Sequence, residues 1–355
     1  MVSTLPNTQS DPLFGSNHFT PIRWVLAGFV ALGHFWLTTT GYEPFRLHQW
    51  TGGYMAVNGF FVLSGLLIMK SLATRNDLKS YAVSRLLRIY PALIALMVVF
   101  IFIFSTVFSK PGGLPNLASP DTWSYALRVL LMGDPEGAPG GIFMGNVEQD
   151  FNGPLWTIRY ELAAYVLAAF AFAIGLAKRL WTTVAMLVAV QAIYILAPLA
   201  VDVSALPASI WPLFRLSGCF LLGMALWHWP AGRRPPWWSI GVVAILFAVF
   251  GAGFAGELLA TLLLTGLMLR LGLSRRQFKP LLKLPDYSYG IYIWHYPIIQ
   301  AVLFFIPGLG PFGIMAISTP LFILFAGLSW HMIEKPALTL KSRIPNARVN
   351  PKSNK

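Results

Sequence analysis

The chain has 355 residues, of which 56% are hydrophobic and only 11% are charged, a composition that argues against a soluble domain and indicates a polytopic membrane protein. The formal charge of +13 does not indicate nucleic-acid binding, because 21 of the 26 Lys and Arg residues fall on one side of the predicted topology. The single cysteine, Cys219, excludes an intrachain disulfide and a cysteine-rich metal site, and we expect no metal.

Ten apolar stretches are candidates for membrane-spanning helices, and the second and eighth of them are short. They predict an all-α, polytopic bundle of about ten transmembrane helices in a bacterial inner membrane, with both termini in the cytoplasm. The predicted spans are 22–38, 53–69, 89–108, 155–175, 181–201, 212–229, 237–254, 257–273, 287–306 and 312–332. The expected divisions are a cytoplasmic tail at 1–20, one transmembrane domain at 21–338 and a basic cytoplasmic tail at 339–355.

The first stretch carries Arg23 and His34 eleven positions apart. On an α-helix this spacing places both side chains within roughly 20° of each other on one face and roughly 16 Å apart along the axis. With Arg23 at the interface, His34 lies near the middle of a hydrocarbon core about 30 Å thick, where an ionisable side chain indicates a functional site. The alternative is an imidazole that only forms a hydrogen bond with a neighbouring helix.

Small residues interrupt the second stretch, where Asn58 precedes Gly59 and Ser64 precedes Gly65. Small residues allow two helix backbones to approach closely, and they also allow a local break in a helix. Tight helix packing and a direct role in a site both remain open for these positions.

A basic cluster that includes Lys79, Arg85 and Arg88 follows the second stretch. Arg85 and Arg88 are three residues apart and therefore share a helix face. The cluster either sets the topology and contacts lipid phosphates, or clamps a phosphorylated donor from the cytoplasm, since guanidinium groups bind phosphate bidentately.

The fourth stretch begins with Arg159 and Glu161, close to its outer end and next to the amphipathic Trp156. Charged side chains at that depth need a partner or a water-filled cavity. Because they are two apart, they do not face each other, and Arg215 in the sixth stretch is available to pair with Glu161. The preceding segment, 109–153, is rich in Gly, Pro and acidic residues, and we expect it to face the exterior.

The ninth stretch concentrates polar and aromatic side chains, including Asp286, Tyr292 and His295, and Pro297 follows two residues later. Tyrosines near the start of a span are typical of an interfacial aromatic belt. His295 lies about eight residues into the helix, which is deep enough for a role in a cavity.

Six segments together, over about residues 20–338, resemble the acyltransferase-3 family of integral membrane acyltransferases, which modify surface polysaccharides, lipopolysaccharide, peptidoglycan, nodulation factors or macrolides. The segments are Arg23 and His34 in the family's Arg-ten-residues-His pattern, GFFVLSG at 59–65, SRLLRIYP at 84–91, LWTIRYEL at 155–162, YSYGIYIWHYP at 287–297 and IEKP at 333–336. The chain departs from the family pattern where Leu162 follows Glu161 in place of a second acid, and where Arg159 replaces a small residue.

The resemblance implies an acyl-CoA-dependent O-acyltransferase, with acetyl-CoA as the usual donor and a sugar hydroxyl of a cell-surface or exported glycan or glycolipid as the acceptor. Histidine suits the general base of acyl transfer because its pKa lies near neutral pH, and His34 is the candidate. Arg23 and Glu161 are the other catalytic candidates. The candidate donor contacts are Lys79, Arg85, Arg88 and Ser64, and the candidate acceptor contacts are Trp156, Tyr292 and His295.

Two other classes of protein remain open. A secondary transporter or exporter also combines many helices with buried ionisable groups, and it predicts inverted repeats, which the sequence does not show. A non-catalytic subunit of a polysaccharide export system would not need His34. Besides the acceptor, the expected partners are membrane lipids and the polysaccharide biosynthesis machinery, without nucleic acid.

Overall fold

The computed structural model describes residues 13–108, 116–137, 139–202, 205–253, 255–276 and 278–340, and it shows a helical membrane bundle. The expectations for residues 1–12 and 341–355, and for the first part of the outer segment at 109–115, lie outside these residues. Within them the only sheet is a two-stranded antiparallel hairpin, in which Arg46 pairs with Thr51 and Leu47 with Trp50.

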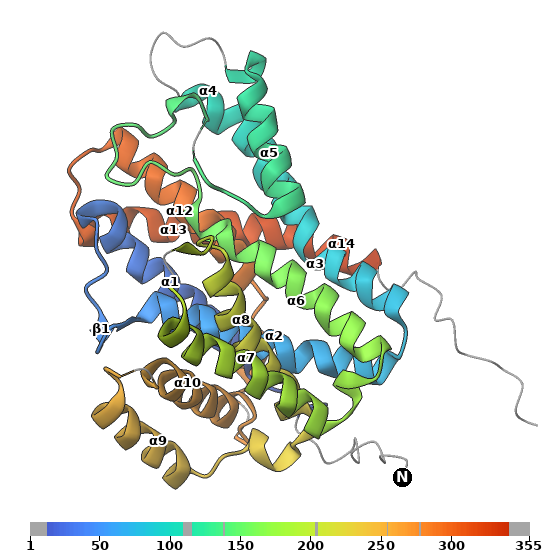
Figure 1. Cartoon of the computed structure of the whole chain (residues 1–355). Coiled ribbons are helices and arrows are strands. Elements are labelled where there is room, and N and C mark those ends of the chain that lie inside the picture. Colours follow the sequence, from blue (N-terminus) through green and yellow to red (C-terminus); the bar gives the residue numbers. More distant parts are fainter. Residues whose placement is uncertain are drawn as a thin grey trace, which may run out of the picture.

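Each of the ten predicted stretches coincides with a helical segment (Figure 1). The long helices are α1 (Phe19–Thr40), α2 (Gly52–Arg75), α3 (Leu78–Val99), α6 (Trp156–Ala173), α7 (Leu180–Ala200), α8 (Ile210–His228), α9 (Trp237–Phe250), α10 (Gly256–Gly272), α12 (Ser288–Phe305) and α13 (Pro311–Ser329). The shorter elements are β1 (Arg46–Leu47), β2 (Trp50–Thr51), η1 (Phe100–Phe104), α4 (Ser105–Val107), η2 (Asn116–Ala118), α5 (Pro120–Met132), η3 (Pro139–Gly141), η4 (Gly153–Leu155), η5 (Leu176–Lys178), η7 (Pro230–Arg233), α11 (Lys279–Leu282), η8 (Trp330–Glu334) and α14 (Lys335–Thr339).

Seven helical segments of the described chain are long and apolar enough to cross a membrane. They are 19–40, 52–75, 78–107, 153–173, 180–200, 210–228 and 311–339. The helix α9 is apolar but has only 14 residues, while α10 and α12, with 17 and 18 residues, do not belong to the seven. The predicted helical membrane bundle is confirmed, and the number of ten spans is approximate. The expectation of a short second span is wrong, because α2 has 24 residues.

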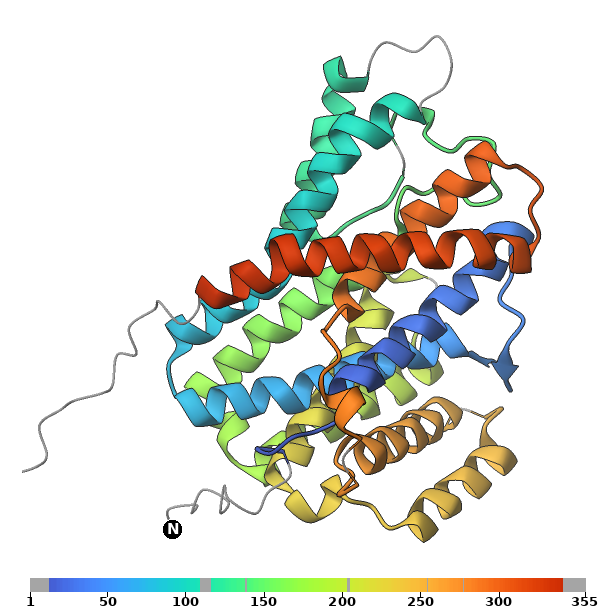
Figure 2. The ribbon, with the colours of Figure 1, turned by 180° about the vertical axis from the view of Figure 1, so that it is seen from behind.

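The helix α2 lies at the centre of the bundle, where it packs against α1, α8 and α10 and also contacts α3 and α6. The helix α1 packs against both α2 and α12, and α12 packs against α13. Figure 2 shows α9 and α10 as a pair on one side of α1, with α12 and α13 on the other. The helix α1 therefore presents one side to α12 and another to α10.

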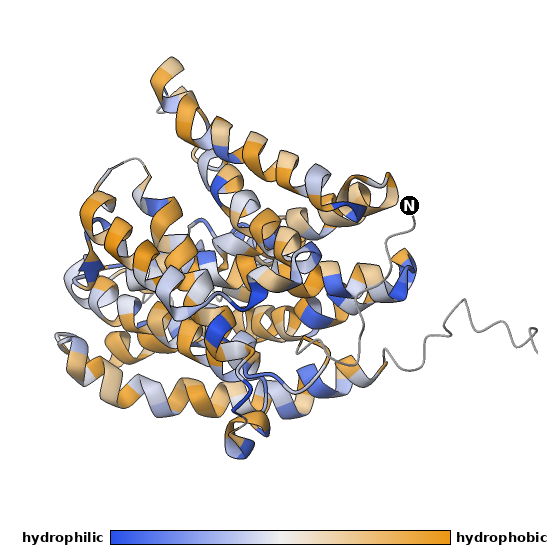
Figure 3. Ribbon diagram, turned by 90° about the horizontal axis from the view of Figure 1, so that it is seen from below, coloured by the Kyte–Doolittle hydropathy of each residue, from blue (hydrophilic) through white to orange (hydrophobic). Residues whose placement is uncertain are grey.

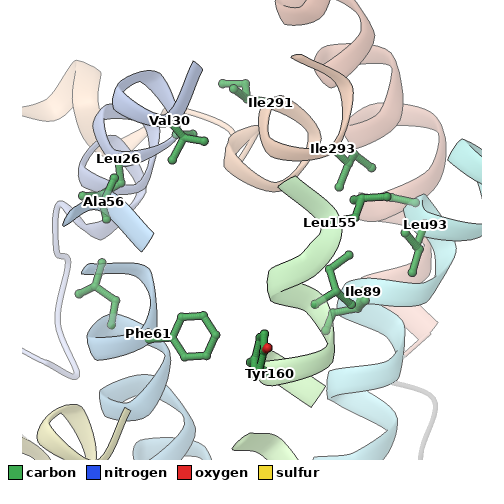
Figure 4. Close-up of a cluster of buried hydrophobic side chains, with 14 of the residues drawn as sticks. Leu26, Val30, Ala56, Phe61, Ile89, Leu93, Leu155, Tyr160, Ile291 and Ile293 are labelled. Atoms are coloured by element: carbon green, nitrogen blue, oxygen red, sulfur yellow. The ribbon is translucent and has the colours of Figure 1, made fainter. Parts of the chain in front are cut away.

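The inside of the bundle is apolar, and so is much of its outer surface. Figure 4 shows the inner face, with Leu26 and Val30 of α1 near Ala56 of α2, and with Ile89, Leu93, Leu155, Ile291 and Ile293 on the neighbouring elements, all of them buried. Figure 3 shows apolar residues along the peripheral helices as well, as expected for helices that face lipid. Polar side chains inside this bundle therefore need hydrogen-bond or charge partners within the protein.

Two glycines bring α2 and α8 into close contact. A Cβ atom on Gly65 would lie 1.9 Å from the Phe220 carbonyl oxygen, and one on Gly223 would lie 2.0 Å from the Val62 carbonyl oxygen. Neither position can hold a side chain without separating the helices. The structure thus assigns Gly65 to tight helix packing, one of the two roles left open by the sequence.

We predict that Gly65→Ala or Gly223→Ala destabilises the protein by about 1–3 kcal/mol, the usual cost of overpacking a close contact. Thermal unfolding in detergent measures the effect. Gly28→Ala is the matched control, because no atom lies within 4 Å of a Cβ at this position of α1. Equal unfolding temperatures for all three variants would contradict the close contact between α2 and α8.

Candidate active site

His34 of α1 and His295 of α12 form a direct pair. The distance between His34 Nδ1 and His295 Nε2 is 2.8 Å, and the two rings stack with centroids 5.0 Å apart and an interplanar angle of 13°. The other ring nitrogen of His295, Nδ1, lies 2.9 Å from the carbonyl oxygen of Ile291. His295 is completely buried, whereas His34 is partly exposed.

These contacts assign the protons of the neutral pair. A carbonyl oxygen only accepts hydrogen bonds, so His295 Nδ1–H donates to Ile291 and His295 Nε2 is left as an acceptor. His34 Nδ1–H then donates to His295 Nε2, and the lone pair of His34 is on its Nε2. His295 thereby orients His34 and fixes the tautomer in which Nε2 is basic.

Pro297 leaves one backbone carbonyl oxygen of α12 free to bind a side chain near His295. Proline has no backbone N–H, so the carbonyl oxygen of Ile293 has no partner within the helix. The side-chain amide of Asn152 donates to this oxygen over 2.8 Å, and Asn152 is completely buried. The segment that leads into α6 is therefore attached to α12 next to His295.

A cluster of four charged side chains lies at the other end of the contact between α1 and α12. Asp286 Oδ2 lies 2.9 Å from Arg23 Nη2 and 2.8 Å from Arg88 Nη2, and Ser288 donates to Oδ1 over 2.7 Å. Arg88 Nη1 also lies 3.7 Å from Glu334 Oε2. Two guanidinium groups thus meet two carboxyl groups.

Opposing effects act on the Asp286 carboxyl, which lies just before α12. Burial raises its pKa, but the guanidinium groups of Arg88 and Arg23 and the bonds from Ser288 outweigh burial and hold the pKa below the usual value. Asp286 is therefore ionised at neutral pH, where its charge stabilises the folded chain.

A cavity of about 130 Å³ lies beside this cluster. Its polar lining comes from five elements of the structure. The polar lining includes Arg23, Ser64, Arg85, Arg88, Glu161 and Tyr292. The Tyr292 hydroxyl is hydrogen-bonded to Thr157, at 2.6 Å, and its ring centroid lies 6.3 Å from that of His295. Tyr292 thus connects the cavity to the histidine pair.

Arg85 differs from the other two arginines of the cavity because it has no ion pair within the described chain. Its Nε is buried without a hydrogen-bond partner, and its guanidinium lies 5.7 Å from the centre of the Tyr165 ring. Glu161, the nearby acid, accepts a hydrogen bond from the Tyr165 hydroxyl. Arg85 is therefore the cation of the cavity that is available to an anionic ligand.

The expected pair between Glu161 and Arg215 is wrong. The Arg215 guanidinium lies 3.8 Å from the centre of the Tyr54 ring and 5.8 Å from that of Trp156, whereas Glu161 lines the cavity with Arg85. Side-chain direction explains the error, since the two residues were matched only by their depth in the membrane.

The structure brings together most of the residues that the sequence singles out. Arg23, Ser64, Arg85, Arg88, Glu161 and Tyr292 line one cavity, and His34 and His295 are in contact. Two expected residues lie elsewhere: Lys79 is exposed and does not line the cavity, and Trp156 lies beside Arg215.

Three contributors to this site were not assigned a role from the sequence. Asp286 and Glu334 hold the arginines, and Asn152 binds the carbonyl oxygen released by Pro297. A proline inside a span is a sequence signal for an unpaired carbonyl oxygen, although it does not tell which side chain binds it. The acidic residues lie next to recognised motifs, but their partners are far away in sequence.

Comparisons with known proteins agree with this architecture. An acyltransferase domain model matches residues 21–331, so the chain belongs to this family of acyltransferases. An O-acetyl transferase of Shigella phage Sf6 is 26% identical, with 92% of this chain and 97% of the relative covered. Nodulation protein 10 of Rhizobium leguminosarum is also 26% identical, with 82% and 84% covered.

A peptidoglycan O-acetyltransferase of Listeria monocytogenes is 25% identical over 70% of this chain, which covers 45% of that relative. No solved structure shows a significant match to the chain. The protein is thus a membrane protein of the acyltransferase class.

We predict that Asp286→Asn destabilises the protein by about 1.5–3 kcal/mol at neutral pH, because two half-buried guanidinium groups lose their charge-assisted hydrogen bonds to the shared carboxylate. The pKa of Asp286 is lowered in the folded state, so its contribution to the free energy of unfolding is lost as the pH falls through that pKa. The unfolding temperatures of wild type and Asp286→Asn should therefore converge in acid. Thermal unfolding over a pH series checks this. Asp121→Asn, at an exposed position of α5, should unfold like wild type at every pH, and a similar Asp286→Asn curve would contradict the charge cluster.

Proposed function

We propose that this protein is a membrane-bound O-acyltransferase that moves an acetyl group from cytoplasmic acetyl-CoA to a sugar hydroxyl of a cell-surface or exported glycan. The observation that carries this proposal is the basic Nε2 of His34, oriented by His295 and separated by Tyr292 from a cavity that contains Arg85, a cation without an ion pair. Family membership supports acyl transfer, and two of the relatives are named as O-acetyltransferases.

In the proposed reaction, His34 acts as a general base. Its Nε2 accepts the proton of the acceptor hydroxyl while the hydroxyl oxygen forms a bond to the thioester carbonyl carbon. The carbon–sulfur bond breaks, and the proton on Nε2 passes to the departing sulfur, which restores neutral His34. The hydrogen bond from His34 Nδ1–H to His295 stabilises the imidazolium that forms between these steps.

The cavity supports an anionic donor. A CoA phosphate requires a cation with free N–H donors, and Arg85 has no ion pair and an unpartnered Nε, whereas Arg23 and Arg88 bind Asp286. Ser64 and Glu161 line the same cavity, and we place them next to the donor. Arg23 and Arg88 then act by holding α1 and α3 in place, and we assign Glu161 and Tyr165 to the orientation of the donor arm.

The proposal that the acceptor is a glycan is based on the sequence and on the relatives. The distribution of basic residues supports an inner-membrane topology with both termini in the cytoplasm, so that donor and glycan approach from opposite sides. We place the acceptor near Trp156, Tyr292 and His295, and we infer that the polysaccharide biosynthesis machinery supplies it.

Purified protein reconstituted in liposomes should transfer label covalently from labelled acetyl-CoA to candidate glycans. Transport of label without covalent transfer would instead identify a transporter.

We predict that His34→Ala lowers acetyl transfer by roughly 10²–10⁴-fold, the expected loss for a general base, while CoA binding is retained. His295→Gln should retain more activity than His295→Leu, because a glutamine oxygen can accept the hydrogen bond from His34 Nδ1–H and leucine cannot. Initial rates of glycan acetylation measure both comparisons. A His34→Ala variant with nearly normal turnover would refute the assignment of the base, and equal rates for the two His295 variants would refute its orientation by His295.

We predict that Arg85→Ala weakens CoA binding by about 10-fold or more, as expected for a lost charge-assisted hydrogen bond, and leaves the unfolding temperature nearly unchanged. Calorimetric titration with CoA measures the affinity. Arg88→Ala should lower stability as well, because Asp286 and Glu334 lose a partner. Lys79→Ala is the matched control, since Lys79 is exposed outside the cavity. A larger loss of affinity in Lys79→Ala than in Arg85→Ala would show that the donor binds elsewhere.

A further inference from the structure

A cleft of about 620 Å³ lies on the face of α1 that points away from His295. Its walls come from α1, α2, α10 and the hairpin of β1 and β2, and they are almost entirely apolar. Val25 and Phe29 of α1 and Leu271 of α10 line it with 57%, 48% and 53% of their surface exposed. The cleft is thus open to the surroundings of the bundle, which at this level are lipid.

The hairpin closes one end of the cleft. The Trp50 indole donates to the carbonyl oxygen of Gly251 over 3.0 Å, and His48 Nε2 lies 3.1 Å from the carbonyl oxygen of Phe247. These bonds attach the hairpin to the end of α9, and Figure 2 shows it beside the pair of α9 and α10. Trp50 also lines the cleft, and tryptophan is typical of the level of the lipid head groups.

Two opposite charges lie at this closed end without pairing with each other. The Oε2 atom of Glu43 is buried and has no hydrogen-bond partner among the described residues. Arg46, three residues later, donates through Nε to the backbone carbonyl oxygen of Glu43, and no ion pair joins the two side chains. Both residues line the cleft.

The sequence leaves space for the Glu43 carboxylate. A Cβ atom on Gly33 would lie 2.8 Å from Glu43 Cδ, and one on Gly53 would lie 3.5 Å from Oε2. Two glycines on two helices therefore face this carboxylate, so its position is built into the contact between α1 and α2. A buried carboxylate oxygen without a donor is costly, and a ligand that supplies one removes this cost.

We propose that the cleft binds one phospholipid with a primary amine in its head group, of the phosphatidylethanolamine type. The ammonium donates to Glu43, the phosphate binds the free guanidinium nitrogens of Arg46, and one acyl chain fills the apolar cleft. The lining residues of α1 run from Ile22 to Gly33, which spans roughly 16 Å, or about half of a 30 Å hydrocarbon core.

Charge complementarity selects this head group over others. Phosphatidylglycerol, cardiolipin and polyprenyl phosphates carry anionic groups but no cation, so Glu43 would remain unpaired next to an added negative charge. Phosphatidylcholine carries a cation without N–H donors, so it cannot donate the hydrogen bond that Glu43 Oε2 lacks. The expected order of affinity is phosphatidylethanolamine first, phosphatidylcholine second and the anionic lipids last.

The test is lipid retention by the purified full-length protein in detergent, measured by native mass spectrometry with added phosphatidylethanolamine, phosphatidylcholine, phosphatidylglycerol or undecaprenyl phosphate. Wild type should bind one phosphatidylethanolamine in preference to the others. Glu43→Gln, which keeps the size but removes the charge, should weaken this binding by about 10-fold or more. Glu136→Gln, at an exposed acid outside the cleft, is the matched control and should bind like wild type.

Two further variants separate binding from folding. Arg46→Gln changes an exposed side chain and should also weaken phosphatidylethanolamine binding, even if Glu43→Gln does not fold. Leu267→Trp narrows the cleft and should weaken the binding of every lipid tested. Unchanged binding in Arg46→Gln or Leu267→Trp would overturn the proposal. So would equal retention of phosphatidylethanolamine and phosphatidylglycerol, or preferential retention of undecaprenyl phosphate, which would identify the cleft as a site for a lipid-linked glycan.

Discussion

The neutralisation of Arg23 and Arg88 by Asp286 is the interaction on which the site depends. A guanidinium inside a membrane bundle is costly without a partner, and here one carboxylate binds two of them, at 2.9 and 2.8 Å. This connection joins α1, α3 and the start of α12, and Glu334 adds the segment after α13 through Arg88. Four segments that are distant in sequence are thereby held around one cavity.

The same connection sets the register of the histidine pair. Arg23 and Asp286 meet at one level, and His34 and His295 meet eleven and nine residues further along their helices, roughly 14–16 Å away. One contact at each end of the pair of α1 and α12 fixes the rotation of the two helices as well as the distance between them. The His34 ring therefore keeps its Nδ1 on His295 and its Nε2 available, which is the geometry that a general base requires.

The sequence predicted the parts of this arrangement that depend on local spacing. Eleven residues between Arg23 and His34 place them on one face, and apolar length predicts the helices themselves. It did not predict which distant side chains meet. Arg215 was matched with Glu161 by depth alone, but it lies against Tyr54, because depth does not tell which way a helix is rotated. Asp286 escaped notice as a partner because 263 positions separate it from Arg23.

The number of membrane spans does not affect the site. The site depends on the direction in which α1 and α12 run, and not on how many helices cross the membrane between them. The two contacts require α1 and α12 to run the same way through the membrane. Five long apolar segments lie between them, together with α9 and α10, which form an adjacent pair. A pair either crosses twice or not at all, so it never reverses α12 relative to α1. The short helices α9 and α10 therefore do not change the positions of His34 and His295. These two helices contribute to the wall of the apolar cleft instead.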